Sequence, residues 1–338
     1  MITPNSLDAP TVSTATAETT ANSTSLHRRE AFDADRHAAN LSNWQQRYDQ
    51  LSCGHFYGDI VERPLDNIQL FREHTSQSLR QRCQVWPDSI WLGIPAEAAH
   101  GSRIDGLVTE TNSILCRPGD CEFELITPAA FTIYGIVVSR QRLLQYAQQH
   151  AVEIDWQLLC RRSQRVIPTR TLDALRYLLQ RLLSSQPQHA PALLRQQSDI
   201  TMMALLEVLQ IRQQQPTVAP SYRRRRAVVD TVCELVQQQS NGELTMSELC
   251  AAANVSQRTL QYSFSSILGM SPIQFIRHSR LNGARRDLSR PNNATSVADV
   301  AAHWGFWHLS QFSKDYRRLF AERPSETLAR YTYAHLDS

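Results

Sequence analysis

Two stretches near the C-terminal end combine cations with hydrogen-bonding side chains at helical spacing. Around residues 257–268 the apolar side chains fall on one helical face, and the opposite face carries Arg258, Tyr262 and Ser265. Around residues 309–320 the opposite face carries Ser310, Lys314 and Arg317. Such groups contact base edges and phosphates in DNA. Both faces therefore predict nucleic-acid contacts, with solvated surface as the alternative for any single residue.

The N-terminal half contains no convincing catalytic or metal-binding pattern. A cupin enzyme needs paired histidines and a carboxylate around one metal, but His55, His74 and His100 are isolated. We therefore assign no catalytic residue and no metal ligand. The stretch Asp35-Arg-His-Ala-Ala-Asn40 lacks the glycine of cobalamin-binding loops, and we interpret it as coincidence.

Two further groups have both a structural and a functional interpretation. Cys116 and Cys121 flank a Pro-Gly-Asp turn, so they are either strand-end residues, which we favour, or a redox pair. A set of aromatic residues on short strands either fills the core or lines an effector pocket: Phe71, Trp86, Trp91 and Tyr134.

An internal repeat organises the C-terminal region. The pattern Leu260, Phe264, Leu268, Gly269 and Pro272 recurs 52 residues later as Phe312, Tyr316, Phe320, Ala321 and Pro324. Upstream, Leu249 and Val255 recur as Val300 and Phe306 with an offset of 51. A short helix, a tight turn and a second helix in each copy define a helix-turn-helix. We place the two motifs at about residues 245–268 and 296–320.

Local signals support both copies and the segment between them. Thr245-Met-Ser-Glu248 is a capping box, and Ser296-Val-Ala-Asp299 is a weaker version. Asn254 and Gly305 lie where the turns need a left-handed backbone. A helix from Ser271-Pro272 to about Leu288 would be a spacer of roughly 26 Å. The two second helices could then enter successive major grooves, which recur about every 34 Å.

The remainder of the chain divides into four segments. Residues 1–38 are expected to be a disordered tail, and short apolar runs punctuated by turns predict a β-domain at 39–150. Residues 151–214 are a helical connector whose two apolar stripes either pack on the β-domain or form a dimer interface. The first stripe is Leu172, Leu175, Leu179 and Leu182, and the second is Leu194, Ile200, Met203 and Leu206. Residues 215–222 are a linker, and residues 223–338 are the DNA-binding domain.

Charge and composition agree with this division. Residues 222–338 contain 15 Arg and Lys against 10 Asp and Glu, a net charge of +5, whereas residues 1–221 have 20 against 22, a net charge of −2. A basic domain beside a mildly acidic one favours a polyanion as the partner of the former. No apolar run is long enough to span a membrane, and the seven cysteines show no disulfide framework, so we expect a cytoplasmic protein.

The second copy resembles the signature of AraC-type (AraC/XylS) transcription regulators. The resemblance is carried by Ala302-His-Trp-Gly-Phe-Trp-His-Leu-Ser-Gln-Phe-Ser-Lys-Asp-Tyr-Arg-Arg-Leu-Phe320 with Pro324, and by Val255-Ser-Gln-Arg-Thr-Leu260 with Phe264 and Leu268-Gly-Met-Ser-Pro272. It covers roughly residues 225–331. It implies an α+β chain of two domains: a cupin-like β-barrel or sandwich with its helical connector, then an all-α tandem helix-turn-helix domain. Double-stranded promoter DNA and RNA polymerase would be the partners.

The resemblance also implies which residues read DNA. The base-reading candidates are Ser256, Gln257, Arg258, Gln261, Tyr262, His308, Leu309, Ser310, Ser313 and Lys314. Leu309 is apolar where a hydrogen-bonding side chain is commoner, so contact with a thymine methyl group is its alternative role. The candidates for phosphate contacts are Ser265, Arg277 and Arg317.

The N-terminal half resembles a narrower group, the regulators of ethanolamine-utilisation operons. The matching stretches are residues 43–51, 68–73, 82–95 and 117–125. This resemblance implies an activator that responds to ethanolamine together with adenosylcobalamin and has no catalytic cofactor. A small-molecule effector would shift the population of domain arrangements. An AraC-type regulator with a different effector is the first alternative, and a DNA-targeted enzyme is the second, which the missing catalytic pattern disfavours.

Overall fold

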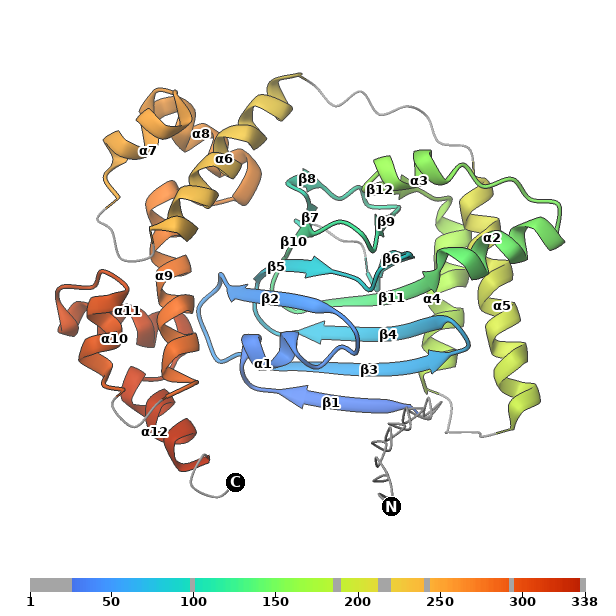
Figure 1. Cartoon of the computed structure of the whole chain (residues 1–338), viewed down its shortest axis with the longest axis horizontal. Helices are drawn as coiled ribbons and strands as arrows, with labels where there is room; N and C mark the ends of the chain where they lie inside the picture. Colours follow the sequence, from blue (N-terminus) through green and yellow to red (C-terminus); the bar gives the residue numbers. More distant parts are fainter. Residues whose placement is uncertain are drawn as a thin grey trace, which may run out of the picture.

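The computed structural model describes residues 26–97, 101–184, 190–211, 220–239, 244–291 and 295–334. Its first part contains two antiparallel sheets that face each other (Figure 1). The seven-stranded sheet has the order β1 (His27–Ala31), β3 (Gly58–Leu65), β4 (Ile68–Thr75), β11 (Phe131–Ser139), β6 (Ser89–Pro95), β9 (Ser113–Pro118) and β12 (Gln164–Val166). The five-stranded sheet has the order β2 (Gln45–Gln50), β5 (Leu79–Gln84), β10 (Phe123–Thr127), β7 (Arg103–Ile104) and β8 (Leu107–Val108).

Alternation along the strands separates two apolar cores. In β11, Ile133 and Val137 face the smaller sheet, whereas Tyr134, Ile136 and Val138 face the helices on the outer side. Because successive strand residues point to opposite faces, one strand serves both cores. The strands with clear apolar runs were predicted, but β2 and β5 were not. Their sequences, Gln45-Gln-Arg-Tyr-Asp-Gln50 and Leu79-Arg-Gln-Arg-Cys-Gln84, are mostly polar.

Helices cover the outer face of the larger sheet (Figure 1). They are α2 (Arg140–Gln149), α3 (Trp156–Arg161), α4 (Thr169–Ser184) and α5 (Pro191–Gln210). The α4 stripe of Leu172, Leu175, Leu179 and Leu182 is buried against the sheet. This stripe therefore packs on the β-domain and is not available as a dimer interface. The expected stripe of α5 is wrong in part, because Ile200 and Met203 are exposed at 40% and 59%. Met202 and Leu205 are buried in their place.

The domain boundaries differ from the expected ones in three places. Residues 27–38, expected in the tail, form β1 and α1 (Ala34–Ala38), and Asp33 caps this helix; residues 1–25 lie outside the described residues. The connector is not separate from the β-domain, because β12 pairs with β9. The linker prediction falls mainly on residues outside the described ranges, and its last three residues, from Pro220, begin α6.

The last described part of the chain forms the helices α6 (Pro220–Gln238), α7 (Met246–Ala253), α8 (Gln257–Leu268), α9 (Pro272–Leu288), α10 (Val297–His303), α11 (Leu309–Phe320) and α12 (Pro324–Ala334). They lie on the side of the sheets away from α4 and α5 (Figure 1). Two separate apolar cores hold them. The first joins α6, α7, α8 and the start of α9, and the second joins the end of α9 to α10, α11 and α12. None of the described helices has both the length and the apolar character that crossing a bilayer demands.

Candidate DNA-reading surface

The first helix-turn-helix unit consists of α7 and α8. The Thr245 hydroxyl accepts a hydrogen bond from the Glu248 amide, and the Glu248 carboxylate accepts one from the Thr245 amide at 2.8 Å. This confirms the predicted capping box. Asn254 ends α7 in the left-handed conformation with φ 49°, also as predicted. The turn then brings Ser256 to the N-cap of α8, where its hydroxyl accepts from the Thr259 amide.

Helix α8 turns an apolar face inward and a polar face outward. Leu260, Phe264 and Ile267 are fully buried in the first core. The candidates on the opposite face are exposed: Gln257, Arg258, Gln261, Tyr262 and Ser265. The Tyr262 ring is 62% exposed, and the guanidinium of Arg225 lies 5.4 Å from its centroid. Cation, phenol and amide groups are therefore free to approach a groove together.

The second unit repeats the plan with α10 and α11. Ser296 caps α10 by accepting from the Asp299 amide at 3.1 Å, and Gly305 has φ 74° in the turn, as predicted. His308 is the N-cap residue of α11, but its side chain makes no capping hydrogen bond. Phe312 and Tyr316 are fully buried in the second core, with the Tyr316 hydroxyl 2.8 Å from that of Thr327.

The outward face of α11 is polar but begins with two apolar side chains. His308, Ser310 and Lys314 are exposed, and Ser313 is half-buried. Leu309 is 46% exposed and the preceding Trp307 is 68% exposed. Sequence reasoning treated Trp307 as part of the turn and missed it as a candidate. Its signal is a large aromatic side chain at the start of a polar helical face.

The three phosphate candidates differ in their surroundings. Ser265 and Arg317 are exposed. Arg277 projects from α9 and makes an ion pair with Asp315 of α11, so its guanidinium already has a carboxylate partner. DNA phosphate would have to compete with that carboxylate.

Helix α9 joins the two units. It spans 17 residues from Pro272 to Leu288, as predicted, and begins with a capping box of Ser271 and Gln274. Phe275 and Ile276 belong to the first core, whereas Leu281 and Ala284 belong to the second. A straight helix of this length is about 26 Å long, so the two units are held apart by one rigid element.

The four residues proposed for an effector pocket are not all together. Phe71 and Trp91 line a cavity between the two sheets with a volume of about 10 Å³. Trp86 packs against the same core, whereas Tyr134 lies on the outer face of the larger sheet. Sequence reasoning missed the polar side chains of this cavity: Gln46, Glu73, Gln81 and Cys83.

The cysteines and other ligand types are dispersed. Cys116 is buried in β9 and Cys121 is exposed, and both are free thiols. Burial raises the pKa of the Cys116 thiol to about 12, which opposes formation of the reactive thiolate. Among the residues that the structure describes, no group of three His, Cys, Asp or Glu side chains is arranged to hold a metal ion.

Comparisons with known proteins find similarity in the C-terminal helical part of the chain. A family model described as a helix-turn-helix domain matches residues 249–330. The chain is 32% identical over 110 residues to the XylDLEGF operon transcriptional activator 2 of Pseudomonas putida, covering 32% of this chain and 70% of that protein. It is 40% identical over 97 residues to the regulatory protein HrpB of Ralstonia nicotianae, covering 28% of this chain but only 20% of HrpB.

The chain is also similar to a solved structure over its C-terminal part. A probable AraC family transcriptional regulator from Rhodopseudomonas palustris is 35% identical, with 31% of this chain and 96% of that chain covered and a TM-score of 0.30. The C-terminal helices and the matching family model define a helix-turn-helix protein. The chain belongs to the AraC-type helix-turn-helix transcription regulators. The relatives named here are a regulatory protein and a transcriptional activator, and neither is an enzyme.

Proposed function

We propose that the protein is a sequence-specific transcription activator that reads promoter DNA with α8 and α11. The observation that carries this proposal is the duplicated arrangement of a buried apolar face and an exposed polar face. The base-reading candidates of both helices and the phosphate candidates Ser265 and Arg317 would contact one duplex. An activator acts at promoters in the cytoplasm, so RNA polymerase is the expected protein partner.

Trp307 and Leu309 give the second reading helix a distinct preference. Both are exposed at the start of α11, where residues of a recognition helix contact base edges. Apolar side chains at this position favour the methyl group of thymine. The second unit should therefore prefer a thymine opposite its N-terminal end.

The test is selection of binding sites from a random duplex library by the full-length chain, followed by gel-shift measurements. Two half-sites about one helical turn apart should be recovered, with a thymine in one of them that the Leu309→Ala variant no longer selects. Recovery of a single half-site, or of no sequence at all, would contradict the proposal.

The cupin-like β-domain would be the effector domain, and its cavity suggests the effector's charge. Glu73 is 5% exposed, and its carboxylate lies 3.0 Å from His37 Nε2 and 2.9 Å from the Tyr48 hydroxyl. The other buried carboxylates among the described residues all have an arginine partner: Asp33, Asp49, Asp59, Glu62, Glu124 and Glu322. Glu73 instead pairs with His37, which is a cation only when it is protonated. A buried carboxylate is costly without a cation, so Glu73 beside a neutral His37 is suited to a cationic ligand.

Aromatic rings beside Glu73 suit the same class of ligand. Trp44 and Phe71 have ring centroids 5.5 Å apart, and Trp91 stacks on Phe123 at 4.8 Å. Ring faces attract ammonium groups. Trp91 Nε1 is buried without a hydrogen-bond partner and could donate to a hydroxyl group. Ethanolamine, which has both an ammonium and a hydroxyl group, is therefore our proposed effector.

Size limits this proposal in two ways. The cavity of about 10 Å³ has room for roughly one water molecule, so ethanolamine would enter only if the half-buried Trp44 moved. Adenosylcobalamin does not fit the cavity at all. Its proposed role as a second effector is supported only by the resemblance of the N-terminal stretches, and no described residue is assigned to it.

Thermal unfolding with added ligand tests the effector. Ethanolamine hydrochloride should raise the melting temperature of the wild-type chain and of Glu62→Gln, a buried control on the neighbouring strand, but not that of Glu73→Gln. Equal shifts in both variants would remove Glu73 from the site. Stabilisation by another small molecule alone would favour the alternative of a regulator with a different effector.

A homodimer would be formed through the exposed side of the connector helices. The α4 leucines are covered by the sheet, but Ile200 and Met203 of α5 and Tyr177 of α4 are exposed. Sedimentation of the Met203→Asp variant tests this surface, and an unchanged dimer would exclude it.

A further inference from the structure

The β-domain contacts the helix that separates the two reading units. The side-chain amide of Asn282 in α9 pairs with the backbone of Gln50 in β2, accepting from its N–H at 2.8 Å and donating to its carbonyl at 3.0 Å. Both residues are buried, at 4% and 2% exposed. A side chain that completes the edge of a strand in this way fixes the helix in position along it.

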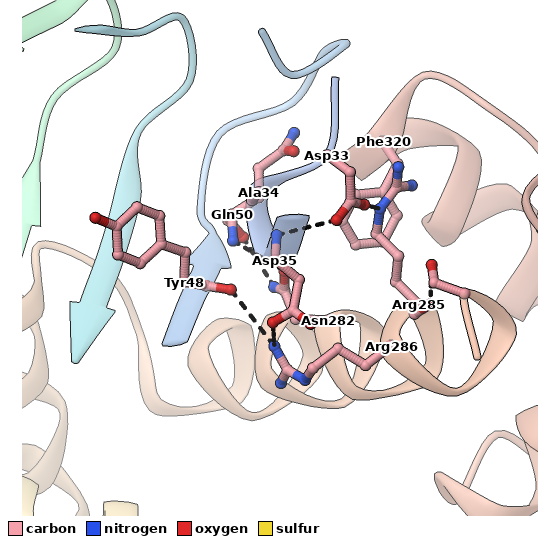
Figure 2. A pocket seen from close by; sticks show the side chains of 10 residues that line it. Asp33, Ala34, Asp35, Tyr48, Gln50, Asn282, Arg285, Arg286 and Phe320 are labelled. Atoms are coloured by element: carbon pink, nitrogen blue, oxygen red, sulfur yellow. Dashed lines mark hydrogen bonds and ion pairs between the residues drawn. The ribbon is translucent and has the colours of Figure 1, made fainter. Parts of the chain in front are cut away.

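Two arginines one turn further along α9 form ion pairs with the same domain. Arg285 Nε donates to Asp33 at 2.6 Å, and Arg286 Nη1 donates to Asp49 at 2.8 Å. Figure 2 shows both guanidinium groups extending from α9 towards the β-domain, with Asp35 beside Arg286. Burial favours the neutral form of Asp49, but Arg286 and Arg47 keep its pKa below the ordinary value. The pairs are therefore charged and largely shielded from water, where attraction is strong.

Each reading unit also has its own contact with the β-domain. In the first unit, the carbonyl of Ser266 in α8 accepts a hydrogen bond from Arg103 at 2.9 Å. In α6, which shares the core of that unit, Tyr222 donates to the carbonyl of Asp105 at 2.8 Å. In the second unit, the Gln50 side chain donates to the carbonyl of Leu319 at 2.8 Å. One domain thus contacts α8, α9 and α11.

These contacts leave the DNA-reading faces open. On α8, the β-domain contacts the backbone of Ser266, whereas Arg258 and Gln261 remain exposed. On α11 it contacts the backbone of Leu319, whereas Ser310 and Lys314 remain exposed. The β-domain therefore acts on the orientation of the units and does not cover them.

We infer that Asp33, Asp49 and Gln50 are positioning residues that brace α9 and hold both reading helices in one mutual orientation. The inference rests on the proposed DNA-binding function. Among the described residues, the two units have separate apolar cores, and α9 contributes to both. An external brace on α9 therefore removes bending freedom that DNA would otherwise have to restrict. Preorganisation of this kind increases affinity for a site that engages both units.

The brace is also connected to the cavity. Its carriers are α1, which Asp33 caps, and β2, which ends with Asp49 and Gln50. The same two elements supply His37 and Tyr48, which both bind Glu73. A ligand that binds Glu73 and displaces His37 and Tyr48 would move α1 and β2, which hold α9. Effector binding would in this way change the position of the DNA-binding half.

A charge swap tests the brace. The full-length variants Asp49→Arg, Arg286→Asp and the double variant Asp49→Arg/Arg286→Asp are titrated with a duplex selected by the wild-type chain and with a version in which one half is scrambled. Each single change should weaken binding to the intact duplex by at least about fivefold, the lower end of typical coupling between sites. The double variant should bind the intact duplex more tightly than either single variant, with full recovery opposed by Arg47 and Asp35, which lie beside the swapped pair. Binding to the half duplex should not change. Glu30→Arg, an exposed carboxylate in β1, is the control for added charge.

Two outcomes would overturn the inference. One is unchanged affinity of folded Asp49→Arg for the intact duplex, and the other is failure of the double variant to recover. Asp49→Asn replaces Asp49→Arg if the latter does not fold. Small-angle scattering without DNA provides a second readout: the single variants should have a larger radius of gyration than the wild type, and the double variant should regain its value. If the radii of gyration change as expected but the protein binds no duplex, the inference about α9 is supported and the proposed DNA-binding function is contradicted.

Discussion

At the scale of single residues, most of the proposed DNA-reading side chains are exposed and do not contribute to the apolar cores. Arg258 is exposed and makes no contribution to the first core. Ser256 differs from Arg258 because it has a structural role. The family resemblance made it a base-reading candidate, but its hydroxyl caps α8. A serine hydroxyl that caps the N-terminus of a helix and also contacts a base has to divide its hydrogen bonds between the helix and the DNA.

Replacement of Arg258 by alanine should weaken binding to the selected site by about 1–3 kcal/mol and relax the preference at one base position. The measurement is gel-shift titration against the selected duplex and its single-base variants. Arg195→Ala, an exposed arginine in α5, removes the same charge from the other domain and should have no effect. Unchanged base preference in Arg258→Ala would exclude it as a reader.

Ala321 is a strained residue in the second unit. It ends α11 with φ 58° in the left-handed region, where the first unit has Gly269 with φ 73°. A side chain in this conformation costs about 1–2 kcal/mol. Ala321→Gly removes this strain and should therefore raise the free energy of unfolding. The gain should be at most about 1 kcal/mol, because the greater freedom of glycine in the unfolded chain offsets part of it. Urea denaturation measures the change, and a loss of stability would contradict the assignment.

At the scale of secondary-structure elements, the helices of the C-terminal repeat could be predicted from the sequence, whereas only some strands of the β-domain could. The boundaries of α8, α9 and α11 follow from caps and apolar spacing within the chain itself. β2 and β5 were missed because their outward residues are polar and few apolar residues mark the inward face. Ile200 and Met203 were expected on the buried face of α5, but both are exposed. The polar residues Gln197, Ser198 and Thr201 are buried instead. Local pattern does not reveal which face a neighbouring sheet will cover.

Strand β11 illustrates a constraint that only the structure provides. A Cβ atom added at Gly135 would lie 2.0 Å from the Phe71 ring, so glycine is what allows that ring to lie against the strand. Gly135→Ala should lower the free energy of unfolding by about 1–3 kcal/mol through overpacking. The experiment is thermal or urea unfolding of the full chain. An unaffected stability would mean that the ring can move aside at no cost.

At the scale of the whole molecule, the sequence predicted two domains and the basic character of one of them, but not how they contact each other. Asp33 and Asp35 were assigned to a disordered tail, whereas Asp33 pairs with Arg285 of α9 and Asp35 pairs with Arg290, just after the end of that helix. Residues separated by about 250 positions leave no local trace of their pairing. The polar cluster around Glu73 escaped notice for the same reason, because His37, Tyr48 and Glu73 come from three different elements.

The net charge of +5 on residues 222–338 predicts a strong dependence of DNA affinity on salt. Each phosphate neutralised should contribute a slope of roughly −0.9 in a plot of log affinity against log salt concentration. Arg317→Ala should reduce the absolute slope by about one unit. A slope near zero for the wild-type chain would contradict an interface built on phosphate contacts.

The central claim is that α8 and α11 of one chain enter successive major grooves. Hydroxyl-radical footprinting of the selected duplex by the full-length protein tests it most directly. The account predicts two protected segments per chain on the same face of the DNA, centred about 10.5 base pairs apart, with Arg258→Ala weakening one segment and Lys314→Ala the other. A single protected segment, or two segments on opposite faces of the duplex, would contradict it.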